Sequence, residues 1–324
     1  MTPDPLGYSK LCLHGLVVEL DLGLRLIRKW TSHLFHPFLV NEQPDGVVPI
    51  EGTVRPYEQD DVIRHISASA QRVPHVDPWL ELYREDERFW LVDERWGITE
   101  ANFLKCQFRS WVLPCPTVDG LRCTEGAVLW PMAQLLRQRG LHLVPALSVA
   151  RDGFGALILA PFSIEPELQH LIRQRYQVVG QRWTALREED GRILMLRMPG
   201  VVERTCAPRL RERCRWEAPE WVDLTSEFPS AGRNYAFCNA VLIAEPGRRA
   251  SASFDVLPHL EAQEHLRMTW PMIDVHPSRR TSAQPATLAR QCRVAQVQLS
   301  RDAGELVSML ERVERLSAAP ARTA

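Results

Sequence analysis

Residues 140–200 read GLHLVPALSVARDGFGALILAPFSIEPELQHLIRQRYQVVGQRWTALREEDGRILMLRMPG. Two apolar runs, Leu143–Val149 and Ala156–Leu159, are separated by Arg151-Asp152-Gly153. Apolar runs of this length favour β-strands, and Asp-Gly between them is typical of a hairpin turn. This part of the stretch therefore predicts two antiparallel strands joined by a tight turn.

The rest of the stretch predicts a helix, a third strand and a second hairpin. Residues 165–175 have helical character, and Gln177–Val179 is a third apolar run. A fourth run, Trp183–Leu186, leads through an acidic turn that ends in Asp-Gly into Arg192–Leu196. The expected order is hairpin, loop, helix, strand, hairpin.

In this order of elements the chain resembles the HPr kinase/phosphatase-like proteins, which share the nucleotide-binding core of phosphoenolpyruvate carboxykinase. In that family a strand–Asp-Gly–strand hairpin leads into a phosphate-binding loop, G-x-x-G-x-G-K-[ST]. A helix, a strand and an Asp-Asp pair follow. The resemblance covers residues 120–316. It implies an α/β (mixed α+β) fold with a mostly β central sheet and flanking helices, and it implies homo-oligomers.

The residues that carry the chemistry of this family are missing from the chain. The position of the phosphate loop is held by Ala160-Pro161-Phe162-Ser163-Ile164-Glu165-Pro166-Glu167, and the position of the acidic pair by Gln181-Arg182. A phosphate cradle needs glycines that let backbone N–H groups close on the anion, a Lys, and a hydroxyl for Mg²⁺. Segment 160–167 has neither Gly nor Lys.

The charge of segment 160–167 also disfavours phosphate binding. Glu165 and Glu167 lie at the expected start of a helix, where carboxylates stabilise the helix and repel an incoming triphosphate. Pro166 fits the first helical turn and removes one N–H donor. We therefore predict a closed site, with Phe162 and Ile164 packed inward and no room for a phosphate. On this reading the chain is a degenerate member of the family.

Composition places the chain among globular proteins. It has 324 residues, 45% hydrophobic and 24% charged, with a formal net charge of −1. These values give no reason to expect binding to nucleic acid or to an anionic membrane. No apolar run is long enough to cross a bilayer, and the N-terminus lacks the layout of a signal peptide. We expect a cytoplasmic protein.

Lysines and cysteines limit the chemistry further. Only Lys10, Lys29 and Lys105 are lysines among 39 basic residues, so no Lys follows residue 105. The eight cysteines include Cys106, Cys115 and Cys123, but no pair has C-x-x-C spacing. We interpret them as reduced thiols that mostly fill the core, and we predict no metal site.

Several cationic residues could contact an anion or a partner. His142 lies where kinase-like relatives have a His before the core hairpin, and Arg151 lies at the hairpin turn. Arg209, Arg211 and Arg213 belong to an Arg-rich stretch that could meet a phosphorylated or acidic partner. Interspersed glutamates make a solvated helix face the more ordinary interpretation of that stretch.

The remaining pattern predicts three parts. Residues 1–120 form an N-terminal α/β subdomain, residues 121–316 the HPr-kinase-like core, and residues 317–324 a disordered tail. Within them we expect a strand at 11–20, a helix from Asp77-Pro78, a hairpin at 89–98, a strand at 105–113 and a helix at 123–140. Later we expect a buried strand at 240–244, a strand at 292–299 and a closing helix at 303–316.

Three functional hypotheses follow. The first is a non-catalytic, pseudokinase-like protein that regulates, scaffolds or binds a protein or peptide, with no cofactor. The second is a divergent kinase or phosphotransferase that acts on a protein or peptide Ser/Thr with ATP and Mg²⁺, and binds phosphate through arginines such as Arg151, Arg182 or those at 204–215. The third is a pocket for a small non-phosphorylated ligand.

Overall fold

The structure is a computed structural model of the whole chain. It describes residues 7–41, 46–57, 66–73, 80–114, 116, 118–160, 165–198, 201–203, 221–223, 228, 230–246, 253–269, 283–299 and 304–318. The chain divides into two compact units, residues 1–141 and residues 142–324.

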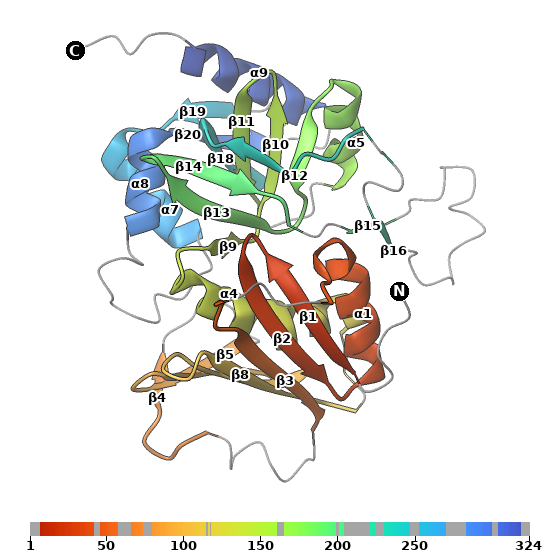
Figure 1. Cartoon of the computed structure of the whole chain (residues 1–324). Helices are drawn as coiled ribbons and strands as arrows, with labels where there is room; N and C mark the ends of the chain where they lie inside the picture. The colour runs from red at the N-terminus through yellow and green to blue at the C-terminus, as the bar shows by residue number, and fades with distance from the viewer. Residues whose placement is uncertain are drawn as a thin grey trace. The chain divides into compact units, whose positions relative to one another are not determined.

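Unit one is built on an eight-stranded mixed sheet of spatial order β1-β2-β3-β8-β7-β6-β5-β4 (Figure 1). Its strands are β1 Tyr8–Leu13, β2 Leu16–Leu22, β3 Ile50–Pro56, β4 Gln71–Val73, β5 Leu80–Glu85, β6 Arg88–Asp93, β7 Gly97–Asn102 and β8 Gln107–Val112. β2, β3 and β8 are parallel, and every other pair is antiparallel. The helical segments are α1 Arg25–Phe35, a 3₁₀ turn at His36–Phe38, α3 Gly120–Thr124, a π-helical turn at Glu125–Leu129, and α4 Trp130–Arg137.

The π-helical turn in unit one lies next to a proline. Pro131 has no N–H, so it cannot donate the helical hydrogen bond to the carbonyl of Ala127. The Ser110 hydroxyl on β8 donates to this carbonyl instead, with an Oγ–O distance of 2.6 Å. Thr99 on β7 lies 2.7 Å from the Ser110 oxygen. All of these groups are buried, so a strand supplies the hydrogen bond that the helix lacks.

Unit two contains a six-stranded sheet of order β12-β10-β11-β18-β20-β19. β11 pairs in parallel with β18, and β18 with β20, whereas the other pairs are antiparallel. The strands are β10 Leu147–Arg151, β11 Phe154–Leu159, β12 Gln177–Gly180, β18 Ala240–Pro246, β19 Ser253–Val256 and β20 Arg293–Leu299. A four-stranded antiparallel sheet holds β9 His142–Val144, β13 Thr184–Glu189, β14 Arg192–Leu196 and β17 Tyr235–Phe237. β15 Val201–Glu203 pairs with β16 Trp221–Asp223.

The six-stranded sheet separates two cores. Ala156 and Ile158 of β11 face one core, together with leucines of α5 Glu165–Arg173 and α9 Glu305–Ala318. Leu157 and Leu159 face the other, which the four-stranded sheet, α7 His259–Thr269 and α8 Ala283–Gln291 complete. Every residue of β11 is buried, as expected for a strand covered on both faces.

The mixed α+β fold, with several sheets and flanking helices, is confirmed. The order hairpin, helix, strand, hairpin is also present, as β10–β11, α5, β12 and β13–β14. The expected loop between β11 and α5 falls on residues 161–164, which lie outside the described residues. The expected strand at 11–20 is instead a hairpin, because His14 and Gly15 both have positive φ and make a tight turn. The helix expected from Asp77 is wrong for residues 80–83, which belong to β5 and pair with β6.

The domain boundary also differs from the sequence-based one. The sequence suggested a division at residue 120, but the structure divides after Leu141. The reason is that the helix over residues 120–137 packs on β3, β7 and β8 of unit one. The described chain ends at Ala318, the last residue of α9, so residues 319–324 of the expected tail lie outside the description.

Removing the Ser110 hydroxyl tests the buried hydrogen-bond chain. Ser110→Ala leaves the Ala127 carbonyl and the Thr99 hydroxyl without this partner, and we expect a loss of about 1–3 kcal/mol in the free energy of unfolding. Urea titration of the full chain, followed through the unfolding of unit one, measures the loss. Ser32→Ala, at a partly exposed position of α1, is the matched control and should change stability by less than about 0.5 kcal/mol. Equal stability of the two variants would contradict this account.

Candidate functional site

The candidate site lies at one edge of the six-stranded sheet. Because β11, β18 and β20 are parallel, their carboxyl ends share this edge. α5 follows β11 and α9 follows β20, so both helices begin here (Figure 1). In α/β sheets, ligands bind outside the carboxyl ends of parallel strands, where helix N-termini present free N–H groups. The edge is therefore where a phosphate would bind if the residues allowed it.

A carboxylate of the chain itself occupies part of this edge. Glu167, in the first turn of α5, accepts a hydrogen bond from the backbone N–H of Gly304, with an N–Oε2 distance of 2.8 Å. Gly304 directly precedes α9 and has a φ of +106°, a conformation that favours glycine. Glu167 thus joins the starts of two helices and supplies an anion to the first N–H groups of α9.

The surroundings of Glu167 penalise its charge. Burial raises the pKa of its carboxyl above the ordinary value, and the charge of Glu305 acts in the same direction. The Gly304 hydrogen bond and the charge of His170 lower the pKa, but by less than burial raises it. The carboxyl of Glu167 therefore loses its proton at a higher pH than that of an exposed glutamate.

The rest of the predicted loop is only partly described. Ala160 packs against the core beneath α5, and α5 begins at Glu165 with Pro166 in its first turn, as the sequence indicates. Residues 161–164 lie outside the described part of the chain, as do the side chains of Glu165 and Pro166. The expectation that Phe162 and Ile164 pack inward therefore stays a prediction.

The position of the acidic pair follows β12 at the same edge. Gln181 is 6% exposed, and within the described residues neither atom of its carboxamide has a hydrogen-bond partner. The carbonyl of Arg182 accepts from the N–H of Ala146 at 3.0 Å. Among the described residues, this position therefore holds a buried neutral amide, whereas Mg²⁺ is usually bound by carboxylates.

Two of the predicted anion contacts have other roles in unit two. Arg151 forms ion pairs with Glu314 at 2.7 Å and Glu311 at 3.5 Å, and its guanidinium lies 4.2 Å from the centre of the Tyr176 ring. An anion at Arg151 would have to displace two carboxylates of α9. His142 is buried in β9 and pairs with Leu186. Arg209, Arg211 and Arg213 lie outside the described residues.

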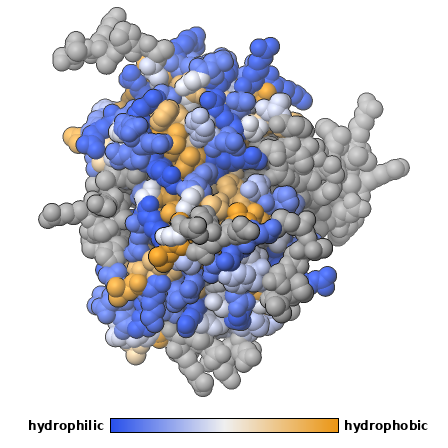
Figure 2. Space-filling view, in the orientation of Figure 1, coloured by the Kyte–Doolittle hydropathy of each residue, from blue (hydrophilic) through white to orange (hydrophobic). Residues whose placement is uncertain are grey.

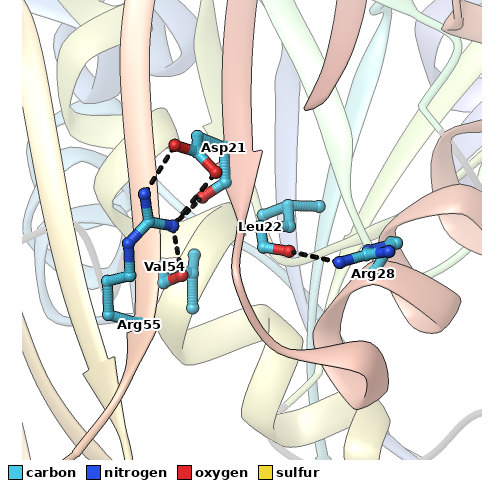
Figure 3. Close-up of polar contacts among 5 residues, drawn as sticks. All are labelled: Asp21, Leu22, Arg28, Val54 and Arg55. Atoms are coloured by element: carbon cyan, nitrogen blue, oxygen red, sulfur yellow. Dashed lines mark hydrogen bonds and ion pairs between the residues drawn. The ribbon is translucent and has the colours of Figure 1, made fainter. Parts of the chain in front are cut away.

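Unit one has a separate polar cluster at the carboxyl ends of β2 and β3 (Figure 3). Arg55 binds both carboxylate oxygens of Asp21, at 3.0 and 2.5 Å, and also the Val54 carbonyl at 3.1 Å. Arg28 of α1 donates to the Leu22 carbonyl at 3.2 Å. The hydrogen bond from Arg55 lowers the pKa of Asp21. Since each charge neutralises the other, the cluster joins two strands rather than presenting a site.

Sequence reasoning missed the partners of Glu167 and Asp21. Gly304 comes just before an amphipathic helix, which is a recognisable signal for a helix start. Nothing in the sequence pairs Gly304 with Glu167, because 137 residues separate them. Arg55 likewise gives no signal, since an arginine in a strand is usually a solvated residue.

Over the described ranges, no cluster of three or more His, Cys, Asp or Glu residues could hold a metal ion. In the same ranges, none of the helices combines the length and the apolar character that crossing a membrane requires.

Comparison with known proteins finds similarity to solved structures, one of which is described here. No known protein family model matches the chain, and no curated protein matches its sequence. A solved structure, the Hpr(Ser) kinase/phosphatase from Coxiella burnetii, matches with a TM-score of 0.33 and 14% sequence identity. The match covers 54% of this chain and 97% of that chain. A match at this score carries no argument, so the fold rests on the strands and helices described above.

Replacing the buried amide should stabilise the protein. Gln181→Met keeps the size of the side chain and removes two polar atoms that have no described partner. We expect the free energy of unfolding to rise by about 1 kcal/mol or more, because a buried polar group without a partner costs about 1–3 kcal/mol. Urea titration measures the rise. Gln177→Met, at the other end of β12, loses an acceptor for Arg233 and should give no gain. A loss of stability in Gln181→Met would show that the amide has a partner.

The raised pKa of Glu167 predicts a pH dependence. Between the ordinary pKa of glutamate and the raised one, the folded protein binds more protons than the unfolded chain, so stability falls as pH rises. Glu167→Gln keeps an acceptor for Gly304 and removes this dependence. We expect the free energy of unfolding of the variant, relative to that of the wild type, to increase as pH rises from 4.5 to 7. Urea titration at each pH measures it. Glu264→Gln, at an exposed position of α7, should follow the wild type. A constant difference across this range would contradict the prediction.

Proposed function

We propose that this chain is a pseudokinase-like protein: a regulatory, scaffolding or peptide-binding relative of HPr kinase/phosphatase that has lost the binding of nucleotide phosphates. The order of elements supports the kinship, because a β-hairpin leads through a loop into a helix, a strand and a second hairpin. The residues at the loop and after β12 support the loss. Fold and function are separable in this way, since function depends on the residues of the site.

The Glu167–Gly304 hydrogen bond is the observation that carries the proposal. A phosphate needs free N–H donors and positive charge, and α9 has already given a donor to a carboxylate of the chain. Segment 160–167 adds no Gly and no Lys, and it brings a second carboxylate, Glu165. A triphosphate at this edge would therefore meet negative charge where an active kinase presents positive charge.

Phosphoryl transfer asks for more than a place for phosphate. It needs a divalent ion bound by carboxylates and a residue that orients the nucleophile. At the expected metal position the chain has Gln181 and Arg182, neither of which is an anionic ligand. This difference favours a protein that binds a partner over one that transfers a phosphoryl group.

The alternative is a divergent kinase or phosphotransferase that acts on a protein or peptide Ser/Thr and holds ATP through arginines. Arg151 is the weaker candidate, because Glu311 and Glu314 already neutralise its charge. Arg182 and the arginines at 204–215 remain as candidates under this alternative. A small non-phosphorylated ligand is the third candidate.

The partner we propose is a protein or peptide, and self-association is expected from the family. Among the residues that Figure 2 colours, hydrophilic ones predominate on the face in view, with apolar patches between them. The most exposed large apolar residues are distributed along the sequence, at Val48, Leu104, Tyr235 and Leu260. Single exposed apolar residues are ordinary in folded proteins and do not by themselves define a binding surface. We propose a cytoplasmic location.

Nucleotide binding tests the proposal directly. Purified protein is heated with Mg-ATP, Mg-ADP, Mg-pyrophosphate or Mg²⁺ alone, and the melting temperature is compared with that of the free protein. A specific ligand at 100 times its Kd adds about 2.7 kcal/mol of stability, which such a measurement detects. We expect no shift with any phosphate compound.

Adenosine is the matched control for the test. A shift with adenosine and none with pyrophosphate would mean that the base is bound without its phosphates, which agrees with the proposal. A saturable, Mg²⁺-dependent rise in melting temperature with ATP or pyrophosphate would contradict the proposal and favour the phosphotransferase. Arg182→Ala and Arg151→Ala would then locate the phosphate site.

A further inference from the structure

Two buried cysteines lie side by side in the core of unit two. Cys238 directly follows β17 and is 6% exposed, and Cys292 directly precedes β20 and is 7% exposed. Both thiols belong to the core between the six-stranded and four-stranded sheets. Both cysteines are free.

The register of the sheet sets the distance between them. Ala240 of β18 lies opposite Arg293 of β20, and the Arg293 N–H donates to the Asn239 carbonyl at 2.9 Å. Cys238 and Cys292 thus lie just before the first paired residues of β18 and β20. Both side chains belong to the same core, and the Sγ of Cys292 reaches the Cys238 carbonyl at 3.3 Å. A disulfide needs close neighbours of this kind, with Cα atoms about 4.4–6.8 Å apart.

Each thiol contacts a backbone carbonyl, and that of Cys292 contacts the carbonyl of Cys238. The Sγ of Cys292 donates to the Cys238 carbonyl at 3.3 Å, and the Sγ of Cys238 donates to the Ala240 carbonyl at 3.4 Å. A hydrogen bond with Cys292, together with burial, raises the pKa of Cys238 well above its usual value. Both cysteines are buried, so an oxidant in solvent reaches them only when the core opens.

We propose that Cys238 and Cys292 are a redox-sensitive pair, which hydrogen peroxide converts into an intramolecular disulfide whenever the core of unit two opens. The bond would join residues 54 positions apart in sequence. It would tie together the starts of β18 and β20, the two parallel strands that support the candidate site. The disulfide would form after the unit has opened, and it would then hold the two strands together covalently. This inference does not depend on nucleotide binding.

The reaction balances with one peroxide. A thiolate attacks a peroxide oxygen, the O–O bond breaks, and the thiol becomes a sulfenic acid with release of water. The second thiolate attacks the sulfenic sulfur, the S–O bond breaks, and the oxygen leaves as a second water with the remaining protons. Two thiols are oxidised and one hydrogen peroxide is reduced. A dithiol reductant reverses the bond by thiol–disulfide exchange.

Peptide mapping of the full chain tests the proposal. The protein is treated with hydrogen peroxide in buffer and in a urea concentration just below its unfolding transition, alkylated, digested and analysed by mass spectrometry. We expect a cross-linked Cys238–Cys292 peptide that forms faster in urea, and a rise in melting temperature that dithiothreitol reverses. Cys12→Ser should keep the cross-link, whereas Cys238→Ser and Cys292→Ser should lose it.

Cys12 and Cys106 serve as internal references, since both are partly exposed. The proposal is overturned if these two are oxidised while Cys238 and Cys292 are both still alkylated in urea. It is also overturned if the cross-link forms but leaves the melting temperature unchanged or lower. If a serine variant fails to fold, the map of the wild-type chain decides the question alone.

Discussion

β11 pairs in parallel with β18, and β18 in parallel with β20, and most features of unit two follow from this. Parallel neighbours need long crossovers, which helices provide and which cover the sheet. β11 is therefore buried on both faces and reads as an unbroken apolar run. The same pairing brings the starts of α5 and α9 to one edge, so the geometry of an anion site exists whatever residues stand there.

The backbone of this edge and the chemistry of its residues are separate. Glu167 accepts a hydrogen bond from the Gly304 N–H, and Gln181, just after β12, is a buried neutral amide. Neither residue sets the backbone here, because the sheet and its helices are held by apolar contacts on both faces. Packing and site chemistry are thus carried by different residues, and one can change while the other stays.

The sequence predicts the core of unit two well and the site poorly. Runs such as 154–159 and 240–246 have few structural alternatives, and Asp-Gly turns set the hairpins, as at Asp190-Gly191. The sequence did not predict β5, because its pairing with two neighbouring strands of a large sheet determines its conformation. In addition, the Pro that precedes Leu80–Glu85 is typical of a helix start. The Glu167–Gly304 contact could not be predicted, since pairing across 137 residues leaves no local pattern.

The Ser110–Ala127 hydrogen bond has a consequence for the order of folding. Residues 97–137 form two antiparallel strands and the helix that follows, and their contacts are close in sequence. Such local contacts cost little loop-closure entropy and form early. β3, in contrast, joins β8 in parallel from more than 50 residues away. The helix around Pro131 gains its missing hydrogen bond only once β8 is in place, so strand and helix should form as one cooperative segment onto which β3 later docks.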